Sequence, residues 1–282
     1  MKKRVLLFVF LGSAFGVCPV FASGHGPVFG LATPTNPKGG FSVDFTFMGR
    51  SGEGRDGAMM RAALGYGITE NLKVSASAPV VFSAEPFAPS RMSAFTPMNG
   101  DFEGLLTWRF QRKDTGVGSR LESAIVGGVV AGGPQRMGGV LRELDGSVGG
   151  VIGAVSGFAS RSNYFWAGST YQRYKAEGGG RRPDLLSYSV AYAYRPRSWR
   201  TDSGWDWRIF GEMTGERAGA LMLSGAKVPG SDSHQIYFGP TTLGVYKNYG
   251  VSAGIQVPLY RAVSSVYPQE RFRWSVNFAY FF

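Results

Sequence analysis

Histidine, serine and aspartate occur together in the stretch SDSHQ at residues 231–235. These are the residue types of a hydrolase in which a histidine base activates a serine nucleophile. The nucleophile, the base and the group that orients it must converge on one point, whereas consecutive residues of a strand or loop point in different directions. No phosphate-binding glycine loop or zinc-ligand spacing is present either. We therefore interpret His234 as part of a solvated strand end and predict no enzyme activity.

The other histidine, His25, lies three residues after Ala22, where we expect the amino-terminal signal peptide described below to be cleaved. Cleavage there would make Ser23, Gly24 and His25 the first three residues of the mature chain. A free amine, two backbone nitrogens and an imidazole supply the square-planar nitrogen donors that Cu(II) accepts. The sequence thus allows a copper site at His25, and the alternative is an exported tail whose third residue happens to be histidine. No cofactor is predicted.

Several methionines fall on one side of the set of β-strands that we predict below, either near the strand ends or in the loops that join them. Thioethers adapt to irregular apolar ligands and also bind soft metal ions, so the set suggests a hydrophobic mouth first and a metal-binding mouth second, with ordinary loop packing as the alternative. The loop at residues 83–99 is apolar and proline-rich, which suits such a mouth. The methionines assigned to this extracellular mouth are Met59, Met60, Met92, Met98, Met137 and Met222.

The amino terminus has the pattern of a secretory signal peptide at residues 1–22. Lys2, Lys3 and Arg4 precede an apolar run that ends at small residues near Ala22. An uncleaved anchor is the alternative, but polar and glycine-rich sequence follows directly and the run is short for a membrane span. The whole chain carries a formal net charge of +11, and the mature chain stays basic after these three groups are removed.

Residues 271–282 show a strict alternation of side-chain type. Aromatic and apolar side chains occupy one face up to Phe282, and the other face becomes polar and basic. A wall between hydrocarbon and water has this pattern, which predicts a membrane β-strand. Similar segments of roughly ten residues, separated by turn residues, predict strands at 40–50, 57–68, 72–83, 100–112, 119–131, 146–160, 163–175, 184–195, 205–215, 234–246, 250–261 and 271–282.

The fold class predicted from these segments is all-β, an antiparallel transmembrane β-barrel of about twelve strands of the bacterial outer-membrane type. Short and long connections nearly alternate, so both termini are expected in the periplasm. The short link near residues 51–55 breaks the pattern, and the link at 196–204 is longer than the others on its side. The expected domains are the signal peptide at 1–22, a periplasmic tail at 23–39 and the barrel at 40–282.

Alternation within the strands also assigns the two faces of the wall. Phe41, Val43, Phe45 and Phe47 are expected outside, and the residues between them inside. Charged lumen residues could form ion pairs that brace the wall or could select solutes, and both interpretations stay open. The residues assigned to the lumen are Asp44, Arg61, Glu103, Arg109, Glu122, Arg208, Glu212 and Arg273.

Other protein classes fit the sequence less well. No mature segment approaches 18 consecutive apolar residues, which excludes a helical membrane bundle. The single cysteine, Cys18, lies in the signal peptide, so neither a disulfide nor a lipid anchor is expected. A β-sandwich or lipocalin-like barrel is the soluble alternative, but a narrow barrel could not bury so many aromatic side chains.

Three stretches carry a resemblance to a known family: HGPVFGLATPTNPKGG at 25–40, LGYGITENLKVSASAPVVF at 64–82 and GDFEGLLTWRF at 100–110. In these stretches the chain resembles outer-membrane transporters grouped with the meta-pathway phenol-degradation family. The resemblance implies uptake of aromatic or other hydrophobic compounds and defines no catalytic residues.

These observations favour a passive, porin-like outer-membrane channel for small, hydrophobic or aromatic molecules. The alternatives are a structural or surface-interaction barrel with a closed lumen and a copper-related outer-membrane protein. Expected partners are outer-membrane lipid and lipopolysaccharide, a small hydrophobic solute and the barrel assembly machinery, with no nucleic acid. The assembly machinery would read a carboxyl-terminal signal of alternating aromatics formed by Phe282, Tyr280 and Phe278.

Overall fold

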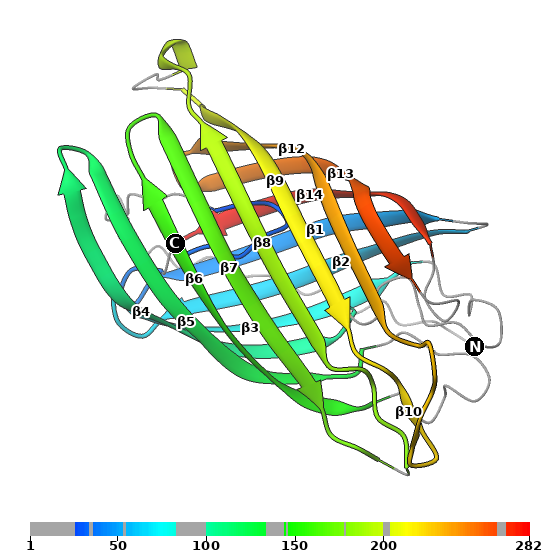
Figure 1. The fold of residues 1–282 in the computed structure, drawn as a ribbon. Helices are drawn as coiled ribbons and strands as arrows, with labels where there is room; N and C mark the ends of the chain where they lie inside the picture. The colour runs from blue at the N-terminus through cyan, green and yellow to red at the C-terminus, as the bar shows by residue number, and fades with distance from the viewer. Residues whose placement is uncertain are drawn as a thin grey trace, which may run out of the picture.

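The computed structural model describes residues 26–33, 36–52, 55–82, 100–133, 144, 146–177, 179–199, 204–263 and 269–282. In this part of the chain, twelve antiparallel strands form one closed barrel (Figure 1). The strands are β1 (Phe41–Gly52), β2 (Arg55–Gly67), β3 (Leu72–Val81), β4 (Phe102–Gly116), β5 (Ser119–Ala131), β6 (Val148–Ala159), β7 (Asn163–Tyr174), β8 (Leu185–Tyr194), β9 (Asp206–Ala218), β12 (Ser233–Tyr246), β13 (Tyr249–Val263) and β14 (Glu270–Phe281).

All twelve predicted strands are present, and each predicted boundary lies within four residues of the observed one. Each strand pairs with the two strands beside it in the ring, and β1 closes the ring by pairing with β14. At the closure, the backbone nitrogen of Phe41 donates to Phe282 O at 2.6 Å, and that of Phe282 donates to Phe41 O at 3.0 Å. The final aromatic residue is therefore part of the seam that closes the barrel.

The link between β9 and β12 contains structure that the sequence analysis did not predict. Met222–Leu223 (β10) and Ala226–Lys227 (β11) form a small hairpin, with Gly225 at a φ of 80° in its turn. A short 3-10 helix, η2 (Arg197–Trp199), lies in the link between β8 and β9. Among the described residues, no helix is long and apolar enough to cross a membrane.

The two ends of the barrel differ in their links. We call the end that carries the links β2–β3, β4–β5, β6–β7, β8–β9 and β12–β13 the short-turn end, and the opposite end the long-link end. The carboxyl-terminal Phe282 lies at the short-turn end, and the β10–β11 hairpin lies at the long-link end (Figure 1). The predicted alternation of links is thus seen around the ring with two exceptions, the short link between β1 and β2 at the long-link end and the long link between β8 and β9 at the short-turn end.

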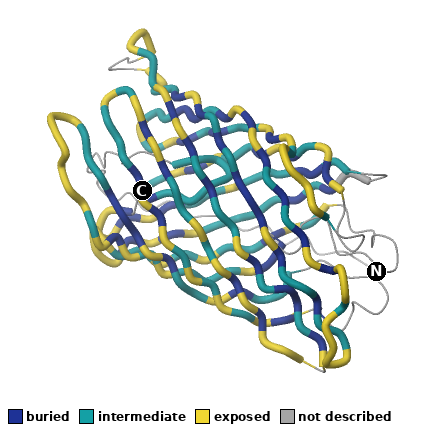
Figure 2. The backbone as a smooth tube through the Cα atoms, viewed as in Figure 1, coloured by how far each residue is buried: buried dark blue, intermediate teal, exposed yellow. Residues whose placement is uncertain are grey.

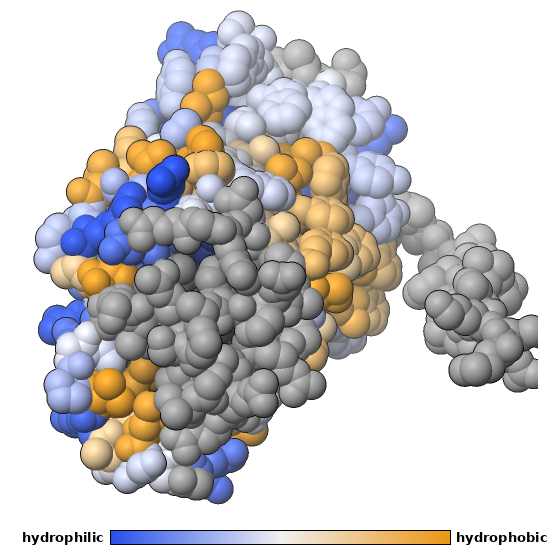
Figure 3. Space-filling view, turned by 90° about the vertical axis from the view of Figure 1, so that its right-hand side faces the viewer, coloured by the Kyte–Doolittle hydropathy of each residue, from blue (hydrophilic) through white to orange (hydrophobic). Residues whose placement is uncertain are grey.

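Inward and outward positions alternate along the strands as predicted. In Figure 2, buried and exposed residues alternate along much of the wall. Phe45 and Tyr192 on the outside are 43% and 50% exposed, while Thr46 and Ser189 line cavities inside the barrel. Figure 3 shows apolar side chains gathered on part of the outer surface, next to hydrophilic residues. Because a soluble barrel would have to bury this surface, the apolar outer wall supports the membrane fold class.

The tail at 23–39 was expected in the periplasm, outside the barrel. Its described part lies elsewhere. Residues 26–33 lie within the barrel and make hydrogen bonds to the inner wall. The chain then reaches β1 past Asn36, whose side-chain amide donates to Ser42 Oγ at 3.1 Å and to Gly65 O at 3.2 Å. We call residues 26–33 the lumen loop.

Candidate functional site: the barrel lumen

The lumen loop is held by one buried carboxylate near the middle of β9. The backbone nitrogens of Val28 and Phe29 donate to the two oxygens of Glu212, at 2.7 Å and 2.8 Å. Glu212 is only 1% exposed and also accepts a hydrogen bond from Thr241 Oγ1. Hydrogen bonds to an ionised acceptor are stronger than those between neutral groups, so Glu212 is a firm anchor for the loop.

Two further contacts attach the loop to other strands. The backbone nitrogen of Leu31 donates to Ser189 Oγ on β8 at 3.3 Å, and Thr33 Oγ1 donates to Glu122 Oε2 on β5 at 3.4 Å. The loop therefore bridges strands from different sides of the ring.

Glycine fits best at two places in the loop because neighbouring atoms come very close. A Cβ atom at Gly26 would lie 2.1 Å from Ala32 Cβ, so the two arms of the loop meet there. A Cβ atom at Gly30 would lie 2.8 Å from Ser189 Oγ, so the backbone runs directly against the wall. The loop is thus packed tightly against itself and against β8.

Three cavities adjoin the loop. The largest, of about 560 Å³, is lined by Thr33 and by residues of the β4–β5 and β6–β7 regions at the short-turn end. A second, of about 340 Å³, is lined by Val28–Leu31 and by residues such as Arg61 and Arg273. A third, of about 180 Å³, lies between Gly26–Val28 and the inner face of β1 and β14. The loop consequently divides the space inside the barrel.

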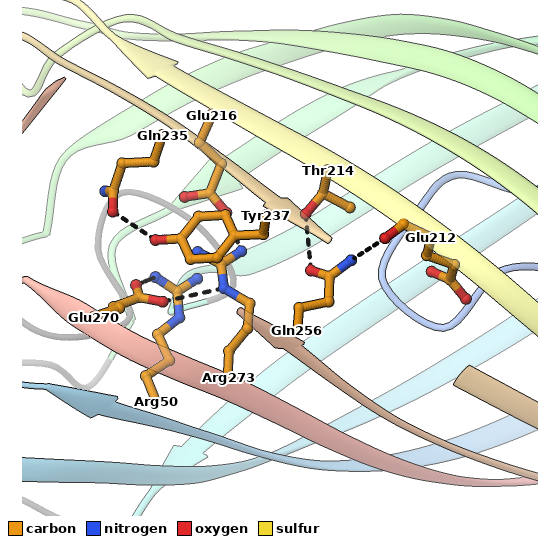
Figure 4. A network of polar contacts seen from close by, with 9 residues as sticks. All are labelled: Arg50, Glu212, Thr214, Glu216, Gln235, Tyr237, Gln256, Glu270 and Arg273. Carbon is orange, nitrogen blue, oxygen red and sulfur yellow. Dashed lines mark hydrogen bonds and ion pairs between the residues drawn. The ribbon is translucent and has the colours of Figure 1, made fainter. Parts of the chain in front are cut away.

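Towards the long-link end, arginines and carboxylates form the network shown in Figure 4. Arg273 on β14 contacts Glu216 on β9 and donates from Nε to Glu270 Oε2 at 3.1 Å. Arg50 on β1 donates to Glu270 Oε1 at 2.8 Å. The guanidinium carbon of Arg273 also lies 3.5 Å from the ring centroid of Tyr237. These buried charges pair with one another across β1, β9 and β14, and the ring of Tyr237 on β12 lies against Arg273.

The same picture contains a second chain of contacts that reaches the loop anchor. Thr214 Oγ1 donates to Gln256 Oε1 at 2.9 Å, and Gln256 Nε2 donates to the backbone oxygen of Glu212 at 3.2 Å (Figure 4). Gln256 and Glu212 are 0% and 1% exposed. The position of the anchor is therefore fixed by side chains from the neighbouring wall.

Towards the short-turn end, Glu122 is surrounded by arginines. Its Oε1 lies 3.1 Å from Arg109 Nη1, 3.4 Å from Arg120 Nε and 3.9 Å from Arg112 Nε. Arg109 also donates to Asn71 Oδ1 and to the backbone oxygen of Glu70. One carboxylate thus faces three guanidinium groups, and this region of the lumen is positively charged.

The structure places all eight of the charged residues assigned to the lumen on the inside of the barrel. Arg61 pairs with Glu103, Arg109 with Glu122, and Arg208 with Asp206 at 3.1 Å. The remaining three are separate: Asp44 lines the smallest cavity, Glu212 binds the loop, and Arg273 lies in the network of Figure 4. Most of these residues are therefore in ion pairs that brace the wall, and a selectivity role remains a prediction.

Sequence reasoning missed several functional side chains. Arg50 has the same inward parity as Asp44 and Thr46, so the alternation alone could have found it. Arg120 and Glu122 likewise share a face, whereas Glu216 and Glu270 were placed in expected loops because β9 and β14 extend farther than predicted. The lumen loop has no periodic pattern, so nothing in its sequence showed where it would lie.

The methionines assigned to the mouth do not form one described cluster. Met59 is 1% exposed and packs with Met48 and Val81 near the long-link end. Met60 lies next to it on the opposite face of β2, and Met222 is in the β10–β11 hairpin. Met92, Met98 and Met137 lie outside the described residues, as does His25, so the methionine mouth and the copper site stay predictions.

The histidine of the SDSHQ stretch lies on the outer face of the barrel. His234 Nε2 is 2.9 Å from Tyr188 Oη, and its ring is in edge contact with Tyr260. This arrangement is an aromatic cluster rather than a nucleophile paired with a base. Within the described part of the chain, no group of three or more histidine, cysteine, aspartate or glutamate side chains could hold a metal ion.

Comparison with known proteins supports the fold. The COG4313 outer membrane channel from Pseudomonas putida F1 superimposes with a TM-score of 0.60 and 11% sequence identity, over 92% of this chain and 100% of that one. The chain has the fold of an outer-membrane β-barrel. The NanC porin superimposes with a TM-score of 0.50 and 8% identity, over 84% of this chain and 98% of that one. No protein-family profile and no curated protein sequence matches the chain.

Proposed function

We propose that this protein is a passive outer-membrane channel for small solutes. Its outer wall is apolar, while its lumen contains paired charges, hydrogen-bonding side chains and cavities on both sides of the lumen loop. This combination suits a pathway for solutes across a lipid layer. The two structurally similar proteins named above are described as a channel and a porin, which agrees with the proposal.

The observation that carries the proposal is the position of the lumen loop between the cavities. The loop is attached by hydrogen bonds and not by a strand ladder, so it can leave its site without opening the wall. Three contacts hold it, at Glu212, Ser189 and Glu122. In the proposed channel, the loop sets the size of the conducting path.

The proposal includes an orientation and a solute class. Outer-membrane barrels have short turns on the periplasmic side, so the short-turn end and the carboxyl terminus would face the periplasm. The solute would be small and hydrophobic or aromatic, as the resemblance to the phenol-degradation group implies. Met48, which packs on Met59 and lines the cavity of about 340 Å³, supports such a solute because thioethers adapt to apolar ligands.

A reversible cross-link tests the role of the loop. An ideal Cβ at Gly30 lies 3.0 Å from Ser189 Cβ, slightly closer than the ~3.5–4.5 Å found across disulfides, so a small shift would allow a bond between cysteines at these sites. The mature Gly30→Cys/Ser189→Cys protein would be reconstituted in planar bilayers. We expect low conductance when oxidised and higher conductance after reduction, in the same channels.

The matched controls are the two single-cysteine variants, whose conductance should not respond to the redox change. Equal conductance of the oxidised and reduced double variant would contradict a role of the loop in setting the path. A wild-type protein that passes neither ions nor hydrophobic solutes would favour the alternative, a structural barrel with a closed lumen.

A further inference from the structure

The cavity beside Thr33 has the features of an anion site. It lies at the short-turn end, has a volume of about 560 Å³ and is lined by three arginines and two acidic residues. The arginines become more buried in the order Arg112, Arg120 and Arg208, whose side chains are 51%, 29% and 9% exposed. Guanidinium groups therefore line the cavity from its exposed part to its buried part.

The two acidic groups do not neutralise this arrangement. The carboxylate of Glu122 is already shared by Arg109, Arg112 and Arg120, and it also accepts from Thr33 Oγ1. Asp114 lies in the exposed part of β4. The charge inside the cavity therefore favours an anion over a cation.

Arg208 supplies the strongest indication of a ligand. Its Nη2 donates to Asp206 Oδ2 at 3.1 Å. The other oxygen of this carboxylate, Oδ1, pairs with Arg195 Nε. Its Nε and Nη1 are buried and have no hydrogen-bond partner among the described residues. A buried guanidinium nitrogen without a partner is costly, and a carboxylate is the group whose geometry matches guanidinium donors.

Aromatic rings next to Arg208 indicate that the anion is organic. Tyr164 and Trp166 line the same cavity, and their rings are stacked at 5.8 Å with an interplanar angle of 5°. The guanidinium carbon of Arg208 lies 4.7 Å from the Tyr164 ring centroid. Apolar ring edges beside a cationic group suit a molecule with a carboxylate at one end and an apolar body.

We propose that this cavity, formed by Arg208, Arg120, Tyr164 and Trp166, binds small apolar monocarboxylates. Arg208 binds the carboxylate in the buried part, Arg120 lies between this part and the exposed rim, and the aromatic rings contact the apolar body. The inference rests on the proposed function, because it names the class of solute that passes through the lumen and the place where it is held.

Binding is tested by isothermal titration calorimetry of the full mature protein in detergent, with benzoate as the probe. Benzyl alcohol, which has the ring without the charge, and inorganic phosphate, which has the charge without the ring, are the comparison ligands. We expect saturable binding of benzoate that is at least about tenfold tighter than binding of either comparison ligand, since benzyl alcohol lacks the charged hydrogen bond and phosphate lacks the apolar contact with the rings.

The variant Arg208→Gln should weaken benzoate binding at least about tenfold, because it removes the charge from the buried donor group. Arg120→Gln should weaken binding less, and it keeps the test possible if the buried substitution prevents folding. The matched control is Arg173→Gln, whose side chain is 64% exposed and lies outside the cavity. The control should bind benzoate like the wild type.

Benzoate binding that is unchanged in both cavity variants would overturn the site, and phosphate binding as tight as benzoate would overturn the organic ligand class. Calorimetry does not depend on conduction, so the two proposals can fail separately. A barrel that conducts ions but does not bind benzoate keeps the proposed function and loses this inference. A barrel that binds benzoate but conducts nothing keeps the site and loses the channel.

Discussion

The carboxylate of Glu212 lies 2.7 Å from the backbone nitrogen of Val28, although the two residues are 184 positions apart in the chain. The contact joins the middle of a barrel strand to a segment that precedes the first strand. Since Phe29 binds the other oxygen of the same carboxylate, Glu212 accepts two adjacent backbone N–H groups. This pair of hydrogen bonds makes the anchor sensitive to small chemical changes.

Glu212→Gln should loosen the lumen loop without changing the size of the side chain. The amide presents a donor where one carboxylate oxygen accepted a hydrogen bond, and each lost bond to a charged acceptor is worth about 1.5–3 kcal/mol. We expect a higher mean conductance of single channels in planar bilayers. The control is Glu103→Gln, an isosteric change in the lumen at a residue paired with Arg61. Equal conductance of Glu212→Gln and this control would contradict the anchoring role.

Arg273→Met should destabilise the barrel strongly. Its guanidinium group contacts both Glu216 and Glu270, and the side chain is 6% exposed. Removing one partner of a buried ion pair leaves the other charge uncompensated and costs about 3–5 kcal/mol. We expect a lower urea midpoint for the loss of the compact band in unheated gel electrophoresis.

Arg271→Met is the matched control for this change, because Arg271 is two residues away on the same strand and exposed. Its urea midpoint should stay near that of the wild type. If both variants unfold at the same midpoint as the wild type, the network around Arg273 does not stabilise the barrel.

The strands could be predicted because lipid outside the barrel and water inside it require apolar and polar side chains at alternate positions. The segment 119–131 was predicted with the bounds observed for β5, since apolar and small residues alternate there between clear turns. An even number of strands also allows the antiparallel closure of β1 on β14. The small β10–β11 hairpin was missed because two-residue strands are too short to show a period.

The lumen contacts were only partly predictable for a different reason. Alternation predicts that Arg273 points inward, but Glu216 fell in an expected loop, and their strands, β14 and β9, are not neighbours in the ring. Their contact depends on the curvature of the wall and the reach of the side chains, which no one-dimensional pattern contains. The lumen loop is bound to Glu212 through its backbone, so the types of its side chains could not have predicted this contact.

Phe282→Ala should lower the yield of assembled barrel. The ring of Phe282 stacks on Phe41 at 5.5 Å and on Tyr280 at 5.6 Å, and its backbone closes the seam with β1. The measurement is the fraction of membrane-inserted protein that shows a compact, heat-modifiable band. The control is Phe165→Ala, which removes an outward aromatic ring, 44% exposed, from β7. Equal fractions for the two variants would remove the special role of the terminal ring.

Cysteine labelling on intact cells should report which end of the barrel faces outward. The single cysteine, Cys18, lies in the predicted signal peptide, so each engineered mature chain would carry one thiol. Lys227→Cys places it in the exposed β10–β11 hairpin at the long-link end, and Val117→Cys places it in the β4–β5 turn at the short-turn end, where Val117 is 90% exposed.

A membrane-impermeant maleimide should therefore label Lys227→Cys on intact cells and should label Val117→Cys only after the outer membrane is permeabilised. The physical reason is that short turns lie on the periplasmic side of outer-membrane barrels. Labelling of both variants after permeabilisation is the control for thiol reactivity. Labelling of Val117→Cys alone on intact cells would reverse the orientation, and the arginine-lined cavity would then be the entrance from outside rather than the exit to the periplasm.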